Sequence, residues 1–170
     1  NISTSNKAKG ADIVIWTTTP WTIPGNRAIA YSADSKYCRI KIINTADNAL
    51  SQVGDEIVVA EALLNQVAEK AGILEHQVTE IFNGSELSGT ICEHPFKDLG
   101  YDFKVPLLAA DFVEMDTGSG FVHIAPGHGS DDWELGIANG ISVPDTVGGD
   151  GLYYKDVPVF AGVHVYKADE

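Results

Sequence analysis

The sequence predicts one α+β domain in which many short strands form a closed or strongly curved, β-barrel-like structure with short helical decorations. Most of its apolar stretches are short, rich in β-branched and aromatic residues, and bounded by Gly, Pro, Asn or Asp, which is typical of strands. Only two stretches have the spacing of a helix. The chain has 170 residues, 44% of them hydrophobic, so it is long enough to bury one core of its own.

The expected strands are separated by turn signals. The first is the stretch 11–18, "ADIVIWTT", whose apolar and β-branched residues lead directly into consecutive threonines. The stretch 45–55 is expected to be a loop with a turn at Gly54-Asp55. The other expected strands are 27–32, 37–43, 76–82, 105–115, 120–125 and, near the end of the sequence, 162–166.

Two helices are expected. The first follows a strand-like start in the stretch 56–72, and Gly72 is expected to be its C-cap. Its apolar stripe consists of Ala60, Leu63, Leu64, Val67 and Ala71. The second helix begins near Ser130 or Asp131 and is stopped by Gly140. The remaining residues are interrupted by Gly and Pro and are best interpreted as loops.

Charge and cysteine content limit the partners and the compartment. The formal net charge is −13, whereas a domain that binds nucleic acid tightly by itself normally has a basic face. Cys38 and Cys92 indicate no disulfide framework, which fits a reducing compartment. No apolar run approaches the roughly 18 residues of a membrane span, and residues 1–10 lack the apolar region of a secretory signal. We therefore expect a cytoplasmic protein without a membrane partner.

The stretch "WTTTPWTIPGN", residues 16–26, is unusual both for a surface loop and for a buried strand. Three consecutive threonines lie between two tryptophans, and two prolines and a glycine follow. Proline restricts the backbone, and β-branched threonine is stiff at χ1. The pattern therefore predicts a short, rigid corner that presents hydroxyl groups beside large aromatic side chains.

The stretch "DTGSGFVHIAPGHGSDDW", residues 116–133, has the composition of a ligand site. Two histidines, His123 and His128, precede two aspartates at the expected helix start. If Asp131 caps that helix, Asp132 is freer to face a cavity. Glycines that allow close approach of a ligand to the backbone are Gly118, Gly120, Gly127 and Gly129.

Three kinds of site remain open for these residues, and their spacing does not choose among them. A metal site would use both histidines and an aspartate, but the spacing matches no strong zinc pattern. A phosphate-binding loop would need GxxxxGK[ST], or GxGxxG at the head of a helix, and neither occurs. A polar pocket would use an aspartate for a cationic amine while His and Thr groups orient water and an ester. A lone histidine is more often structural than catalytic.

The stretches "WTTTPWTIPGNRAIA" and "DTGSGFVHIAPGHGSDDW" together resemble the threonine-rich peptide and the GTG/HxAPGHGxDD segment of the editing (CP1) domain of isoleucyl-tRNA synthetases. That domain is the large insertion in the catalytic core of this class I enzyme, and the resemblance spans about residues 11–166. The valyl and leucyl versions resemble TTRPET and TTRPDT, whereas Thr19 and Trp21 stand at the Arg and acidic positions here. Ser119 departs from the Thr that is more frequent in GTG.

The resemblance implies hydrolytic editing of valyl-tRNA(Ile), and of valyl-adenylate, in a size-selective pocket that excludes isoleucine. Asp132 would hold the α-ammonium group of the substrate, Trp21 would form part of the wall, and a positioned water would attack the ester carbonyl. No metal and no cofactor are implied. The implied catalytic residues are Thr17, Thr18, Thr19, His123 and Asp132, and the implied substrate-binding residues are Trp21, Asn26, Gly127 and His128.

By the same resemblance, residues 1–170 are one editing domain of a larger synthetase. Its partners would be the 3′ end of aminoacylated tRNA(Ile), valyl-adenylate and the rest of the enzyme. No KMSKS motif is present and "PGHG" is not the HIGH signature, so aminoacylation by these residues is not expected. The alternatives are a non-catalytic aminoacyl-binding module and a metal-dependent hydrolase that uses His123 and His128.

Overall fold

The computed structural model describes residues 7–49 and 51–168, whose strands form two four-stranded sheets accompanied by few and short helices. The predicted α+β class is confirmed. The chain divides into two compact units. Among the described residues, unit 1 contains 7–16, 30–49, 51–92 and 107–122, and unit 2 contains 17–29, 93–106 and 123–168. The assignment of 1–170 as a single editing domain stays a prediction.

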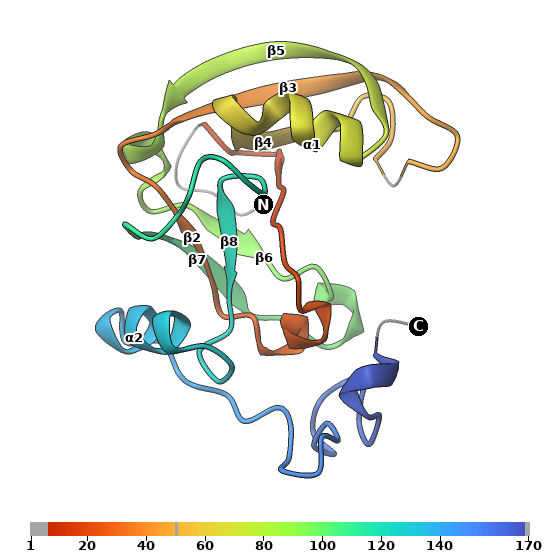
Figure 1. Cartoon of the computed structure of the whole chain (residues 1–170), viewed down its shortest axis with the longest axis vertical. Coiled ribbons are helices and arrows are strands. Elements are labelled where there is room, and N and C mark those ends of the chain that lie inside the picture. The colour runs from red at the N-terminus through yellow and green to blue at the C-terminus, as the bar shows by residue number, and fades with distance from the viewer. Residues whose placement is uncertain (1–6, 50, 169–170) are drawn as a thin grey trace. The chain divides into compact units, whose positions relative to one another are not determined.

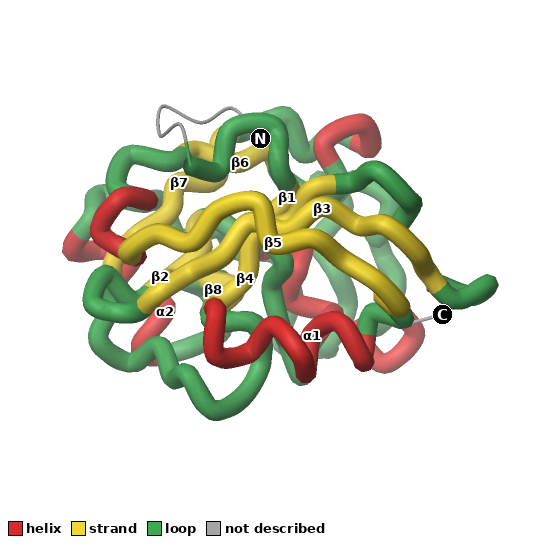
Figure 2. Tube along the Cα trace, turned by 90° about the horizontal axis from the view of Figure 1, so that it is seen from above, coloured by secondary structure: helices red, strands yellow, loops and turns green. Residues whose placement is uncertain are grey.

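The first sheet lies in unit 1 and has the order β1-β4-β3-β5. Its strands are β1 (Asp12–Ile13), β4 (Glu56–Ala60), β3 (Lys36–Thr45) and β5 (Ile73–Asn83). Strand β1 pairs with β4 in parallel, and β3 is antiparallel to both of its neighbours. Figure 2 shows the two long strands β3 and β5 running side by side.

The core of unit 1 is built around Tyr37 on β3. Its ring is fully buried and lies 4.8 Å from the ring of Phe121 and 6.5 Å from that of Phe82, centroid to centroid. Its hydroxyl donates to the carbonyl of Gly120 at 2.8 Å, so the buried polar atom has a partner. The sheet adds further fully buried branched side chains, Ile40, Ile42, Val58 and Val59.

The first expected helix is present as the 3-10 helix η2 (Glu61–Leu63) followed by α1 (Leu64–Lys70). The helix lies against β4 and β5, as Figure 1 shows. Its buried side chains, Val67 and Ala68, face the unit interior. Gly72 follows the C-cap residue with a φ of +69°, the left-handed conformation that ends many helices.

The second sheet has the order β6-β7-β2-β8. Its strands are β6 (Ile91–Glu93), β7 (Lys104–Ala109), β2 (Ala28–Tyr31) and β8 (Phe121–Ile124). Both sheets keep two edge strands, so the described residues form no closed barrel. The barrel-like part of the expectation is corrected in this respect.

Three expected strands are changed by the structure. The strand at 11–18 ends at Ile13, after which Val14 N donates to Val58 O and Trp16 forms an isolated bridge with Val122. Pro20 then begins a 3-10 helix. The strand at 105–115 ends at Ala109, after which the chain turns. The strand at 162–166 is wrong. Gly162 has a φ of +74°, and His164 Nδ1 then accepts from Tyr166 N as the cap of the 3-10 helix η5 (Val165–Lys167).

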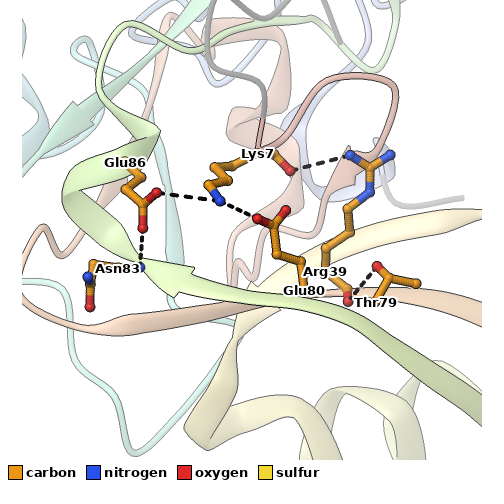
Figure 3. A network of polar contacts seen from close by, with 6 residues as sticks. All are labelled: Lys7, Arg39, Thr79, Glu80, Asn83 and Glu86. Carbon is orange, nitrogen blue, oxygen red and sulfur yellow. Dashed lines mark hydrogen bonds and ion pairs between the residues drawn. The ribbon is translucent and has the colours of Figure 1, made fainter.

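A network of charged side chains fixes the beginning of the described chain in unit 1 (Figure 3). Lys7 forms ion pairs with Glu80 on β5 and with Glu86. The backbone oxygen of Lys7 accepts from the guanidinium of Arg39 on β3, which is itself paired with Glu56 on β4. Because these pairs are partly exposed, each contributes about 0–1 kcal/mol, and their structural effect is mainly positional.

Two sequence expectations concern the compartment. Cys38 and Cys92 are both buried free thiols, in agreement with the absence of a disulfide framework. Within the described ranges, no helix has the length and apolar character needed to cross a membrane. Residues 1–6, on which the signal-sequence argument largely rests, lie outside the described residues.

We predict that Gly120→Ala strongly destabilises unit 1. Gly120 has a φ of +80°, and an added Cβ would lie 2.3 Å from the Cβ of Ala60. Backbone strain and overpacking should together lower the free energy of unfolding by about 2–5 kcal/mol, measured by urea denaturation.

The matched control is Gly54→Ala, which also has a positive φ but would meet no atom within 4 Å. It should cost only the strain component of about 1–3 kcal/mol. Equal losses for the two variants would contradict the close approach of Gly120 to Ala60.

Candidate functional site

Nine residues were predicted as site residues, and all nine lie in unit 2. They come from two segments, 17–26 and 123–132. The remaining part of the glycine-rich stretch lies in unit 1, where Gly118 packs on Trp16 and Gly120 on Ala60. These two glycines therefore allow close packing within the protein rather than contact with a ligand.

The predicted rigid corner contains the 3-10 helix η1 (Pro20–Gly25), which directly follows the three threonines. Pro20 occupies its first position, where the missing N–H costs nothing and the fixed φ suits a helix. Thr22 N donates to Thr19 O at 3.0 Å and Asn26 N donates to Ile23 O at 2.9 Å, which closes the two turns. Tight turns of this kind explain why the apolar run does not continue as a strand.

Side chains hold the carbonyl groups of η1, two of them from distant parts of the chain and one from the adjacent Arg27. The hydroxyl of Tyr153 donates to Trp21 O. Arg27 Nη1 donates to Pro24 O at 3.1 Å and to Asn26 O at 2.7 Å. His94 Nδ1 accepts from Phe96 N, so its proton is on Nε2, which donates to Ile23 O at 2.9 Å. No local pattern in the sequence links His94 or Tyr153 to the corner, because they lie 71 and 132 residues from their partners.

The three threonines differ in their exposure. Thr17 is half-buried, and its Oγ1 accepts from Thr19 N at 3.0 Å. Thr18 and Thr19 are exposed, and the hydroxyl oxygens of Thr17 and Thr19 are 3.4 Å apart. This part of the corner therefore offers hydroxyl groups to solvent, as the sequence predicted.

His123 on β8 is buried, and its hydrogen bonds fix its tautomer. The amide nitrogen of Asn26 donates to Ala28 O at 3.0 Å and to His123 Nδ1 at 2.6 Å. Since Nδ1 accepts, the ring proton is on Nε2, which donates to Thr22 Oγ1 at 3.0 Å. The Thr22 hydroxyl donates in turn to Thr19 O at 2.8 Å. The chain of bonds thus runs from Asn26 through His123 to the threonine-rich segment.

The pKa of His123 is lowered to about 4, mainly by burial and also by the neighbouring His94 and His128. At neutral pH the ring is uncharged, with both nitrogens occupied. In this arrangement His123 positions Asn26 and Thr22, and no ring nitrogen is left to accept a proton from a water molecule. Thr22, which sequence analysis did not single out, is part of this network.

His128 and Trp21 form the second contact between the two segments. Their rings meet edge to face with centroids 5.1 Å apart, and His128 Nε2 lies 2.7 Å from Thr146 Oγ1. Burial lowers the pKa of His128. Gly25 packs closely beside this ring, since an added Cβ there would lie 3.1 Å from His128 Cδ2. Gly127 is exposed, and a Cβ added at this position would lie 2.7 Å from Pro144 O.

The expected second helix is α2 (Ser130–Ala138), with Gly129 as its N-cap and no side-chain cap bond. Asp131 is therefore not the capping residue, and that expectation is corrected. Asp132 Oδ2 instead accepts from Ala125 N at 2.7 Å, which connects the first turn of α2 to the end of β8. Asp132 is half-buried, and burial raises its pKa.

An apolar cavity of about 200 Å³ adjoins the corner. Of the predicted site residues, only Trp21 lines it. The other lining residues are Pro20, Ile23, Pro24, Phe96, Tyr153, Phe160 and Ala168. The exposed threonine hydroxyls and this cavity therefore belong to different parts of the corner.

Across the described part of the chain, no three His, Cys, Asp or Glu side chains are placed to hold one metal ion. The two ring nitrogens of His123 are bonded to Asn26 and Thr22. Its imidazole therefore offers no open nitrogen to a metal ion in this arrangement.

The chain is similar to one segment of isoleucine--tRNA ligases from several bacteria. It is 44% identical to the enzyme of Pelagibacter ubique over 161 residues, which is 95% of this chain and 17% of the relative. It is 44% identical to that of Gluconobacter oxydans over 159 residues, and 40% identical to that of Caulobacter vibrioides over 172 residues. The chain spans 17% of the length of each of these relatives. No protein-family model matches the chain.

Solved structures show the same fold. The CP1 domain of GlLeuRS has a TM-score of 0.58 and 19% identity, covering 81% of this chain and 54% of that one. The editing domain of the cytosolic leucyl-tRNA synthetase of P. falciparum has a TM-score of 0.57 and 14% identity, covering 74% and 46%. At these identities the likeness concerns the fold. Together with the relatives, it confirms the resemblance to isoleucyl-tRNA synthetases and to CP1 editing domains.

We predict that His123 stays neutral until the pH approaches about 4, with its proton on Nε2. The unfolded chain binds a proton at the ordinary pKa of 6.5, so protons favour unfolding below that value. This contribution to stability is therefore complete above pH 6.5 and is lost as the pH falls from 6.5 to about 4. Nitrogen-15 chemical shifts of the imidazole would measure both the tautomer and the titration. A proton on Nδ1, or titration near 6.5, would refute the network.

Proposed function

We propose, on the premise that this chain is homologous to a segment of the isoleucine--tRNA ligases and has the fold of an editing domain, that it hydrolyses the ester of valyl-tRNA(Ile). The same site would hydrolyse valyl-adenylate and exclude isoleucine. The chain would act as a deacylase without aminoacylation activity of its own. Its macromolecular partners would be the 3′ end of the aminoacylated tRNA and the rest of a cytoplasmic synthetase.

One observation carries this proposal. The two stretches that resemble the editing motifs are distant in sequence, yet they contact each other through Asn26 and His123, and again through Trp21 and His128. A threonine-rich corner, a neutral imidazole and a half-buried carboxylate are thereby gathered in one unit. Hydroxyl groups and polar side chains of this kind can orient a water molecule toward an activated ester.

A separate hydrolytic site is needed because binding alone discriminates poorly between two amino acids that differ by one methylene. One missing methylene is worth only about 1–3 kcal/mol of discrimination, a limit for which isoleucyl-tRNA synthetase is itself the usual example. A second site must therefore destroy the smaller product, and it must be rigid enough to reject the larger one. The hydrogen-bonded carbonyls of η1 supply such rigidity.

Asp132 would bind the α-ammonium group of the aminoacyl ester. In the described part of the chain no lysine or arginine forms an ion pair with it, so its charge is not neutralised by a protein cation. Its bond to Ala125 N fixes the direction of the carboxylate. A fixed, half-buried carboxylate attracts a cationic amine more strongly than one surrounded by water.

Water would attack the ester carbonyl with help from the exposed hydroxyls of Thr18 and Thr19. His123 would contribute by holding Thr22, and through it Thr19 O, rather than as a general base. An aminoacyl ester is already activated, so the reaction requires positioning more than a strong protein nucleophile. The negative charge of the chain fits this role, since the body of the tRNA would be bound elsewhere in the synthetase.

The central prediction is selective deacylation. Incubation with valyl- and isoleucyl-tRNA(Ile) should release valine at least about 10-fold faster than isoleucine, the lower end of what one methylene provides. Protection of the valyl ester without release would instead indicate a non-catalytic aminoacyl-binding module. Loss of release after treatment with a chelator would indicate the metal-dependent hydrolase.

We predict that Asp132→Asn lowers valyl ester hydrolysis by about 10- to 100-fold, the effect of losing one hydrogen bond to a charged group. The amide oxygen can still accept from Ala125 N, so circular dichroism and the melting temperature should change little.

The matched control is Asp131→Asn, which changes the neighbouring exposed carboxylate. It should retain wild-type hydrolysis. Equal activity of the two variants would remove Asp132 from recognition of the amine.

We predict that Thr19→Ala admits isoleucyl ester, because it shortens an exposed side chain of the proposed sieve. The ratio of valyl to isoleucyl release should fall by about 3- to 10-fold, the scale of a methyl group and a hydroxyl in a binding pocket. Thr79→Ala, on β5 of unit 1, serves as the control and should keep the wild-type ratio. An unchanged ratio for Thr19→Ala would exclude this residue from the sieve.

A further inference from the structure

The stretch after α2, which the sequence predicts as loop, contains a short hairpin at residues 146–154. Val147 and Tyr153 form an antiparallel bridge, and Gly148 N donates to Leu152 O at 2.8 Å. Tyr154 N also donates to Thr146 O at 3.1 Å. The hairpin therefore holds Thr146 and Tyr153 in a fixed relation to each other.

The hydroxyl group of each of these two residues forms a hydrogen bond with one member of the Trp21–His128 pair. Thr146 Oγ1 lies 2.7 Å from His128 Nε2, and the Tyr153 hydroxyl donates to Trp21 O. Both side chains are buried, with 5% and 2% of their surface exposed. Buried hydrogen bonds of this kind are costly to break without replacement.

Packing alone does not fix Trp21 on the side of the cavity. Protein atoms leave about 200 Å³ between Trp21 and the rings of Phe96, Tyr153 and Phe160. Close packing is what normally restrains a buried side chain, and here it is interrupted. The hydrogen bond from Tyr153 to Trp21 O therefore holds the backbone of Trp21 beside the cavity, in addition to the bonds that His94 and Arg27 make to neighbouring carbonyls of η1.

We propose that the 146–154 hairpin is a clamp that sets the position of the Trp21–His128 pair, and that Thr146 and Tyr153 are thereby specificity-determining positioning residues. The consequence for valyl and isoleucyl esters rests on the proposed function, in which Trp21 forms a wall of the sieve. The mechanical part, in which the Tyr153 hydroxyl holds the corner and the Thr146 hydroxyl holds His128, does not depend on the substrate.

The test uses variants of the full 170-residue chain that remove only the hydroxyl interactions, Tyr153→Phe and Thr146→Val. Thr146→Ser retains a hydroxyl and is the rescue variant. Tyr101→Phe is the matched control, because the Tyr101 hydroxyl donates to a backbone carbonyl in the same unit, that of Pro158, at 2.8 Å. Two measurements are made on each variant, namely amide hydrogen exchange in η1 and the ratio of valyl to isoleucyl release.

In Tyr153→Phe, exchange of the Thr22 and Asn26 amides should accelerate by about 3- to 10-fold, the range for loss of one hydrogen bond. Thr146→Val should loosen the contact of His128 with Trp21 and lower the valyl-to-isoleucyl ratio by about 3- to 10-fold, as should Tyr153→Phe. Thr146→Ser and Tyr101→Phe should match the wild type in both measurements.

Unchanged exchange in Tyr153→Phe, or equal acceleration in Tyr101→Phe, would overturn the clamp. Faster exchange with an unchanged ratio would overturn its role in specificity. If the wild-type chain released no valine, the proposed function would fail, while the exchange data would still decide whether the hairpin holds the corner.

Discussion

The buried hydrogen bond between the Asn26 amide and His123 Nδ1 is the interaction on which the candidate site depends. Asn26 has a fixed orientation because its amide also donates to Ala28 O, and this orientation leaves His123 only one tautomer. The imidazole then donates to Thr22, whose hydroxyl donates to Thr19 O. One asparagine side chain thus sets the direction of every later bond in the series. Replacing the side chain of Asn26, His123 or Thr22 would leave a buried polar group without a partner.

Burial makes this network electrically neutral. Desolvation, together with the neighbouring histidines, lowers the pKa of His123 to about 4, and desolvation likewise lowers the pKa of His94 and His128. Three uncharged imidazoles in one unit can act as hydrogen-bonding spacers without repelling one another or a cationic ligand. Asp132 is a half-buried carboxylate beside His128, and it offers the negative charge that these imidazoles lack. The proposed pocket would therefore be neutral at its imidazoles and negative at Asp132.

Local patterns predicted much of the fold, and distant contacts account for most of the remainder. The β-branched runs of β3 and β5, and the helix that Gly72 ends, are visible in the sequence because their periodicity and caps are local. Strand β6, which spans only Ile91–Glu93, is too short to show a pattern. His94 and Tyr153, which hold the corner, and Thr146, which holds His128, had no local signal in the sequence. Their partners become neighbours only after the chain has folded.

The carbonyl groups of η1 that already accept hydrogen bonds affect which groups the corner presents to a ligand. Trp21 O, Ile23 O and Pro24 O already accept hydrogen bonds from Tyr153, His94 and Arg27 within the same unit. The corner therefore turns hydroxyl groups, rather than carbonyl acceptors, toward a ligand. Hydroxyl groups can donate to an ester oxygen, which carbonyl groups cannot. For the proposed substrate, this would place the ester end of the aminoacyl group at the corner and leave the amine to Asp132.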